Sequence, residues 1–530
     1  MPATSIFPDL SALRLEPLEQ TDYLVDGVLR RWEGPVQEVL SPVCEGAPPV
    51  PVRIGSYPML TPVESLQALE AAAKAYDHGR GAWPTMSVAE RIERVQDFTF
   101  RMREQREAVV RLLMWEIGKN QADSGKEFDR TVEYIQATLH ALKELDRTGS
   151  RFTVEEGIIG QIRRAPLGVV LCMGPYNYPL NETFTTLIPA LIMGNTVLFK
   201  PPKYGVLLHQ PLLAAFRDSF PAGVVNTVYG DGARIIGPVM ESGKVDVLAF
   251  IGSTRVANLL KKQHPHPNRL RCVLGLGAKN PAIVLADADL DQAVKECTLG
   301  SLSFNGQRCT ALKLLFVHRS IAGEFVERLA QSVSRLKGGM PWEDGVQITP
   351  LPEAGKTDYL KELVRDAEAR GARVVNPGGG EVEGTFFRPA VLYPVAPEMR
   401  CYQEEQFGPV VPVVPFDELE EPVRYITESH YGQQVSLFGK DPEAISRLVD
   451  PLVNQVSRVN LNSQCQRGPD TFPFTGRKDS AEGTLSVSDA LRVFSIRTLV
   501  AAKETPANKE LLTRIVRERR SKFLNTDFIL

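Results

Sequence analysis

The sequence predicts an α/β protein built around two parallel sheets. Between residues 165 and 280, short apolar runs typical of buried strands, such as GVVLCMGP and NTVLFKPP, alternate with helical patterns. A second series of the same kind begins near Pro281 with AIVLAD and LKLLFVHR, and it ends near RVNLN. Because 530 residues are enough for two or three hydrophobic cores, each series is expected to form its own sheet, with ligands at the carboxyl ends of the strands.

The segments outside these two series have other patterns. About fifty residues at the N-terminus are Pro-rich and irregular, with one strand-like piece around residues 23–28. The next segment, up to about Leu145, has the apolar spacing of helices. Residues 152–164 alternate between apolar and polar side chains, which predicts an extended arm. The strand-like segment 495–502 is expected to pair with that arm.

Composition argues against several classes of protein. A net charge of −3 gives no support to nucleic-acid binding. The best candidate for a membrane helix, Leu187 to Phe199, is interrupted by Gly194 and Asn195, and the N-terminus lacks the pattern of a secretory signal. No membrane association is therefore expected. Seven cysteines scattered through a long chain do not form a disulfide framework, so a reducing cytoplasm is the expected location.

The central motif is FNGQRCTA, which contains Cys309. A cysteine after a Gly-containing turn and before a helical run is expected at a helix N-terminus, where the helix dipole lowers the pKa of the thiol. Taken alone, Cys309 is more typical of an inert buried thiol, as the other six cysteines are. The motifs around it favour the reactive interpretation.

Three further motifs follow predicted strands. Asn177, in PYNYP, lies where an amide can donate to a developing oxyanion, although a lone Asn in a Pro-flanked turn is usually structural. Lys200 ends another strand, at a place suited to a cofactor ribose or phosphate. Gly252 and Ser253 precede a helix whose backbone amides can receive a pyrophosphate. The glycines at 230, 232 and 237 match the dinucleotide-binding glycine motif only loosely.

His264 and His266 have a spacing seen in metal sites, but the sequence places no further metal ligands near them, so no metal is expected.

Together these motifs resemble those of the aldehyde dehydrogenase superfamily from about residue 22 to 503. The resemblance rests on the motifs PYNYP, LFKPP, FIGST, GQRCTA and EEQFGPV. Within the superfamily, the chain is most similar to the NADP-dependent, non-phosphorylating glyceraldehyde-3-phosphate dehydrogenases. The implied activity is oxidation of a small phosphorylated aldehyde, glyceraldehyde 3-phosphate to 3-phosphoglycerate, through a thioester on Cys309.

The resemblance implies a three-part aldehyde dehydrogenase fold. A Rossmann-like cofactor domain is expected over residues 1–150 and 165–280, and an α/β catalytic domain over residues 281–480. Residues 151–164 and 485–505 correspond to a small β arm that mediates oligomerisation, so a homodimer or homotetramer is expected. Residues 506–530 extend beyond the usual end of the family and predict a basic amphipathic helix.

The resemblance also assigns roles to individual residues. The Cys309 thiolate attacks the aldehyde, while the Asn177 amide and the Cys309 backbone N–H stabilise the oxyanion. The positions that hold the substrate phosphate match Arg130, Tyr178, Arg308 and Arg467, and the guanidinium fork suits phosphate oxygens. The expected cofactor contacts are Lys200, Lys203, Gly232, Gly252, Ser253, Glu405 and Phe407. Relatives that prefer NAD usually carry a glutamate where this chain has Lys203, so NADP is expected, with NAD as the alternative.

One position departs from the family pattern. The family motif Glu-Leu-Gly-Gly-Lys supplies a general base for thioester hydrolysis, and here it is Gly-Leu-Gly-Ala-Lys, with Gly275 at the base position. Four interpretations stay open: another carboxylate, with Glu182 and Glu405 as candidates; transfer to a thiol such as coenzyme A; a degenerate member with a binding or structural role; or an introduced substitution. Phosphorylated-aldehyde oxidation ranks first because the four anion-binding positions are retained.

Overall fold

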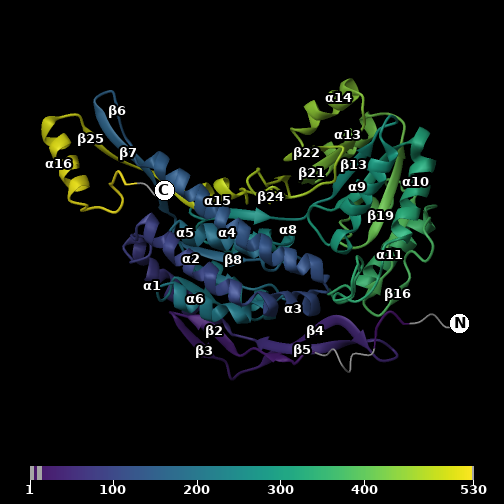
Figure 1. Cartoon of the computed structure of the whole chain (residues 1–530), viewed down its shortest axis with the longest axis horizontal. Helices are drawn as coiled ribbons and strands as arrows, with labels where there is room; N and C mark the ends of the chain where they lie inside the picture. The colour runs from purple at the N-terminus through teal and green to yellow at the C-terminus, as the bar shows by residue number, and fades with distance from the viewer. Residues whose placement is uncertain (1–4, 9–14, 528–530) are drawn as a thin grey trace.

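Two mostly parallel sheets form the centre of the molecule, as the sequence predicts (Figure 1). The computed structural model describes residues 5–8 and 15–527, so parts of the first and last predicted segments (1–4, 9–14 and 528–530) lie outside the described residues. The first sheet has the order β10-β9-β8-β11-β12-β24. Its strands are β8 (Val169–Met173), β9 (Thr196–Lys200), β10 (Val225–Thr227), β11 (Val247–Ile251), β12 (Arg271–Gly275) and β24 (Ala481–Glu482).

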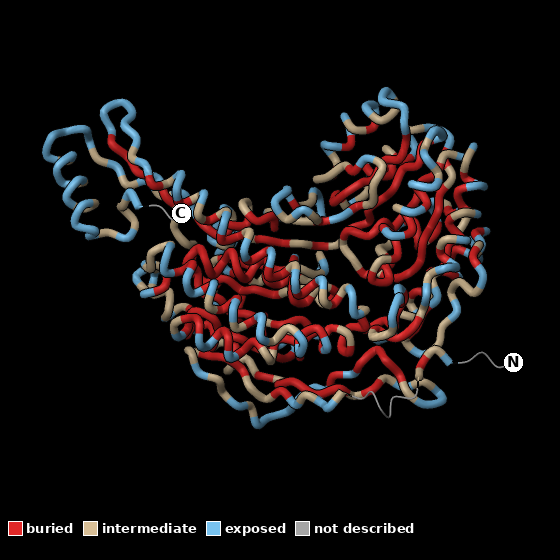
Figure 2. Tube along the Cα trace, in the orientation of Figure 1, coloured by how far each residue is buried: buried red, intermediate tan, exposed pale blue. Residues whose placement is uncertain are grey.

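The second sheet has the order β15-β18-β19-β14-β13-β21-β22. Its strands are β13 (Asn280–Val284), β14 (Leu312–His318), β15 (Arg373–Val374), β18 (Ala390–Tyr393), β19 (Val410–Phe416), β21 (Gln434–Phe438) and β22 (Arg458–Leu461). In each sheet only a two-residue edge strand, β24 or β15, runs antiparallel. The central strands are almost wholly buried, which explains their continuous apolar sequences (Figure 2).

Helices pack against both sheets. α5 contacts β8 and β9 and is buried along its whole length, while α9 and α10 pack against β14. The helices are α1 (Pro62–Tyr76), α2 (Val88–Glu104), α3 (Arg106–Ile117), α4 (Gln121–Gly149), α5 (Asn181–Ile192), α6 (Leu213–Ser219), α7 (Gly232–Glu241), α8 (Thr254–Gln263), α9 (Leu290–Leu302), α10 (Arg319–Ser334), α11 (Lys356–Ala369), α12 (Arg400–Gln403), α13 (Glu420–Glu428), α14 (Pro442–Leu452), α15 (Val487–Val493) and α16 (Pro506–Arg517), with 3₁₀ turns η1 (Asp77–Gly79), η2 (Leu207–Leu212) and η3 (Ser303–Gly306). No helix in the described ranges is both long and apolar enough to cross a bilayer.

The N-terminal region contains more strand than the sequence predicts. Besides β2 (Asp22–Val25) and β3 (Val28–Arg31), it forms the long antiparallel pair β4 (Val36–Glu45) and β5 (Val50–Pro58). The N-terminal segment was expected to be irregular, and that expectation was wrong. Prolines and register shifts interrupt the alternation of apolar and polar residues in β4 and β5, so the sequence pattern of strands is hidden.

Short strands of two residues also occur at β1 (Leu18–Glu19), β16 (Val382–Glu383), β17 (Phe386–Phe387), β20 (Tyr431–Gly432) and β23 (Arg477–Lys478).

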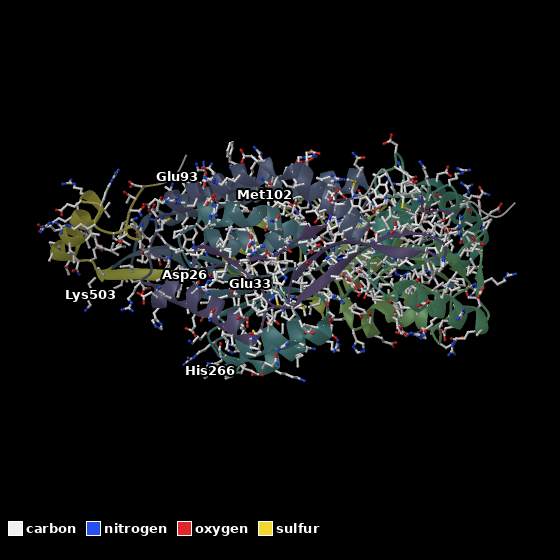
Figure 3. All side chains as sticks on the ribbon, turned by 90° about the horizontal axis from the view of Figure 1, so that it is seen from below. Asp26, Glu33, Glu93, Met102, His266 and Lys503 are labelled. Carbon is white, nitrogen blue, oxygen red and sulfur yellow. The ribbon has the colours of Figure 1, made fainter. Side chains whose placement is uncertain are left out.

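The predicted arm projects from the body of the molecule. β6 (Phe152–Glu155), β7 (Ile158–Pro166) and β25 (Ser495–Lys503) form an antiparallel sheet, and β25 pairs with β7 along its whole length, as predicted. Figures 1 and 2 show this sheet standing away from the body, with its far end exposed, and Figure 3 places Lys503 at the same extremity. Exposed apolar side chains lie along it, namely Val154, Ile158, Ile162, Ile496 and Leu499.

The C-terminal tail folds back onto the arm. α16 ends at Arg517, so the prediction of a helix to residue 530 was wrong for residues 518–527. The chain reverses there, and the side chains of Gln161 and Arg163 on β7 donate hydrogen bonds to the carbonyls of Asn525 (2.6 Å) and Phe523 (3.2 Å). These contacts attach the tail to its own arm.

Candidate active site

A cavity of about 870 Å³ lies between the two sheets. Its walls come from the loops after β8, β9 and β11, from the residues before β14, and from the segment before β19. Most of the predicted site residues line it: Asn177, Lys200, Lys203, Gly232, Gly252, Ser253, Cys309, Glu405 and Phe407. The carboxyl ends of strands from separate parts of the chain therefore converge on one site, as parallel topology requires.

Cys309 does not lie at a helix N-terminus, so that expectation was wrong. The residue sits between η3 and β14, and the apolar run LKLLFVH after it forms a buried strand. Burial raises the pKa of the Cys309 thiol, and the negative charge of Glu182 raises it further, while Lys313 and Arg467 act in the opposite direction. The backbone is fixed by hydrogen bonds to the Cys309 carbonyl from Asn280 Nδ2 (2.7 Å) and Lys313 Nζ (3.2 Å).

Asn177 is buried and held from two sides. Its Nδ2 donates to the Gln307 carbonyl at 2.8 Å, and its own carbonyl accepts from Lys119 Nζ at 2.8 Å. Lys119 forms a fully buried ion pair with Glu127, whose Oε1 also accepts from two backbone amides at the start of α5. This Lys119–Glu127 pair, which the sequence analysis missed, fixes the Asn177 loop close to the Cys309 segment.

The other end of the cavity has the features of a dinucleotide site. Ser253 caps α8, accepting from Val256 N at 3.4 Å, and the first turn of α8 opens onto the cavity. Burial lowers the pKa of Lys200 to about 8, whereas the Lys203 side chain is exposed. Apolar side chains of α7, β11 and α8 line the groove: Ile236, Phe250, Val256 and Leu260. Backbone amides, lysines and an apolar slot fit the phosphates and the base of a nicotinamide dinucleotide.

Two of the four predicted phosphate-binding residues lie together, and one of them, Arg130, lines a second pocket along α4 and not the cavity that holds Cys309. Arg130 and Arg467 share Asp470, with Nη2–Oδ1 and Nε–Oδ1 distances of 2.8 and 3.2 Å. Arg467 also forms a buried ion pair with Glu182, which lines the cavity that holds Cys309. These carboxylates offset much of the positive charge of the two arginines.

The other two predicted positions have different surroundings. Burial raises the pKa of Tyr178; the charge of Arg308 opposes that effect, whereas the charges of Asp123 and Glu127 add to it. Arg308 donates through Nη2 to the Gly300 carbonyl at 2.9 Å. Its Nε is buried and has no hydrogen-bond partner among the described residues. Arg308 thus has one unsatisfied donor, although it is not among the residues that line the cavity.

Gly275 ends β12 and borders the same cavity. Its backbone conformation suits any residue, and an added Cβ would lie 3.4 Å from Ile251 and 3.5 Å from Leu485, which is close to ordinary van der Waals contact. Neither strain nor crowding therefore requires glycine here. The nearby Glu405 is engaged, because its Oε1 accepts from Lys313 Nζ at 2.5 Å and from the Ala278 backbone at 3.2 Å.

Comparison with known proteins identifies the family of the chain. The sequence model of the aldehyde dehydrogenase family matches residues 45–499. The NADP-dependent glyceraldehyde-3-phosphate dehydrogenases of Streptococcus equinus and Pisum sativum are 35% and 31% identical, over 87% and 83% of this chain and 94% and 89% of their own lengths. The crystal structure of the Bacillus halodurans NADP-dependent glyceraldehyde-3-phosphate dehydrogenase complexed with NADP superposes with a TM-score of 0.83 at 30% identity, covering 93% of this chain and 100% of that one. The predicted resemblance and fold are confirmed: the chain belongs to the aldehyde dehydrogenase family.

Proposed function

We propose that the protein oxidises an aldehyde to a carboxylic acid through a thioester on Cys309, with NADP as the oxidant. The supporting observation is the single cavity that joins Cys309 and Asn177 to the dinucleotide features around Ser253 and Lys200. Cys309 Sγ adds to the aldehyde carbon, and the Asn177 amide donates to the resulting oxyanion. Bound NADP supplies the hydride acceptor. Collapse of the oxyanion then leaves the acyl group on Cys309.

The proposed substrate is a small phosphorylated aldehyde, glyceraldehyde 3-phosphate. Arg467 pairs with Glu182 on the cavity wall and shares Asp470 with Arg130, Arg308 has an unsatisfied donor, and relatives named for this substrate match most of the chain. A coenzyme A-acylating reaction is the second candidate, because Gly275 cannot supply the base that hydrolysis needs.

Removing the charge of Arg130 or Arg308 should weaken binding of the phosphorylated aldehyde selectively. In Arg130→Gln and Arg308→Gln, KM for glyceraldehyde 3-phosphate should rise about 10- to 100-fold, the usual effect of losing a charge-assisted hydrogen bond. KM for unphosphorylated glyceraldehyde should change little. The measurement is steady-state NADPH formation with each aldehyde.

Arg106→Gln is the matched control. Arg106 is a half-buried arginine that lines the same pocket as Arg130, but it pairs with Asp129 rather than with Asp470. Its loss should leave both KM values unchanged. Equal increases for the two aldehydes in the Arg130 and Arg308 variants would contradict a phosphate site.

Lys203 should determine the preference for NADP over NAD. Its exposed amine borders the cavity where a 2′-phosphate would lie, so Lys203→Glu should weaken NADP binding about tenfold or more through charge reversal, with little loss for NAD. Fluorescence titration with both dinucleotides measures this. Tighter binding of NAD than NADP by the unchanged protein would refute the assignment.

A further inference from the structure

The thioester on Cys309 must be cleaved before the protein can turn over again, and Gly275 offers no side chain for that step. This question rests on the proposed function, which leaves the acyl group on Cys309. Three carboxylates of the described residues line the cavity: Glu182, Glu353 and Glu405. The three carboxylates differ in their hydrogen-bond and ion-pair partners and in their electrostatic effect on the Cys309 thiol.

Two of the three, Glu405 and Glu353, have partners and little electrostatic effect on Cys309. Glu405 accepts hydrogen bonds from Lys313 Nζ and the Ala278 amide on the same oxygen, and it lies against the predicted cofactor side. Glu353 pairs with Lys356 at 2.9 Å and contacts the Tyr176 hydroxyl at 3.5 Å. Neither carboxylate is among the charges that most affect the pKa of the Cys309 thiol.

Glu182 is also paired, with Arg467, but unlike the other two carboxylates it acts on the Cys309 thiol. It lies in the first turn of α5, and its side chain is nine-tenths buried. Its negative charge raises the pKa of the Cys309 thiol. Its contact with Arg467 uses Oε2, which leaves Oε1 as an acceptor. Arg467 balances the negative charge of Glu182 within the buried pair.

Glu182 is connected through Arg467 and Leu485 to the place where the missing side chain would be. Arg467, the partner of Glu182, donates to the Leu485 carbonyl at 3.1 Å. A Cβ at Gly275 would lie 3.5 Å from Leu485 Cδ1. Leu485 therefore connects Gly275, which lacks a carboxylate, to the Arg467–Glu182 pair, which contains one. Gly275 and Glu182 both line the cavity that holds Cys309.

We propose that Glu182 is the general base that activates water for hydrolysis of the Cys309 thioester. Glu182 Oε1 accepts a proton from water as the water oxygen bonds to the acyl carbon. The C–S bond then breaks, the acid leaves, and the proton passes to Cys309 Sγ. The hydride has already been transferred, so this step needs no further oxidant.

The test is a rapid-mixing time course of NADPH formation with Glu182→Gln. We expect a burst of about one NADPH per active site, followed by a steady rate about 10²-fold or more below that of the unchanged protein. A full burst also shows that the site is intact. Hydroxylamine, which attacks the thioester directly and releases a hydroxamate, should restore turnover.

Three further variants keep the test independent of one substitution. Glu182→Asp keeps the charge opposite Arg467 but retracts the carboxylate, so it should show the burst with an intermediate steady rate. Gly275→Glu added to Glu182→Gln should restore hydrolysis by supplying a carboxylate from β12. Gly275→Ala in the same background should not, since it fills the space without a base.

Several results would overturn the inference. Equal steady rates in the unchanged and Glu182→Gln proteins would exclude Glu182 as the base. A lower KM for glyceraldehyde 3-phosphate with unchanged kcat would mean that Glu182 only balances the charge of Arg467. A burst and stall in the unchanged protein, relieved by coenzyme A, would show acyl transfer to a thiol. Absence of any NADPH from the unchanged protein would refute the proposed function as well, and so differs from these outcomes.

Discussion

Replacing Cys309 with alanine is expected to abolish both the burst and the steady formation of NADPH. The thiol is the nucleophile of the proposed reaction, and loss of a catalytic nucleophile typically lowers kcat by about 10⁴-fold or more. The measurement is the same rapid-mixing experiment, with NADP binding tested in parallel. Because alanine removes only one sulfur atom from the cavity wall, NADP affinity should be unchanged.

Cys272→Ala is the matched control for this prediction. Cys272, like Cys309, is intermediate in exposure, but it lies on β12 and does not line the cavity. Its removal should leave the burst intact. If Cys309→Ala retained the burst, another nucleophile would have to form the acyl intermediate and the proposed mechanism would be wrong.

The pH dependence of the burst follows from the environment of Cys309. Burial and the charge of Glu182 raise the pKa of the thiol, so the thiolate is the minor form at neutral pH. The thiolate fraction increases as pH rises toward that pKa, and the burst rate should increase with it. A burst rate that is flat from neutral to alkaline pH would indicate that the thiolate is already formed in the cofactor complex.

The sequence predicts those parts of the fold whose signals are local. β8, β9 and β11 are continuous apolar runs followed by loops with Pro or Gly, so their positions and the cavity at their carboxyl ends can be inferred without coordinates. β4 and β5 were missed because their alternation is broken by prolines and bulges. The run LKLLFVHR was predicted as a strand and forms β14, so the helix expected directly after Cys309 has no room: only Thr310 and Ala311 lie between Cys309 and that strand.

The polar network behind the site has no local signal. Glu182 and Arg467 are 285 residues apart, so only the tertiary fold brings them together. Lys119 and Glu127 are eight residues apart and resemble ordinary charges of a surface helix, yet both are fully buried behind Asn177. Motifs thus identify the residues that face the ligands, while the residues that orient them become visible only in the folded chain.

Asn177→Ala should slow thioester formation by about 10² to 10³, the usual effect of removing one oxyanion donor. One hydrogen of the Asn177 amide is used by the Gln307 carbonyl at 2.8 Å, and the other remains for the oxyanion that forms when Cys309 attacks. The burst rate should therefore fall, while the burst amplitude stays near one NADPH per active site because the nucleophile is still present.

Asn181→Ala separates this catalytic effect from a structural one. Asn181 is a buried asparagine four residues farther along the same segment, but its amide donates to Thr131 Oγ1 at 3.3 Å, on α4. Both variants lose one buried amide, so comparable losses of thermal stability are expected, whereas only Asn177→Ala should slow the burst. Asn177→Asp should slow it further than alanine does, since a carboxylate would repel the oxyanion. A normal burst rate in Asn177→Ala would mean that oxyanion stabilisation depends on the Cys309 backbone N–H alone.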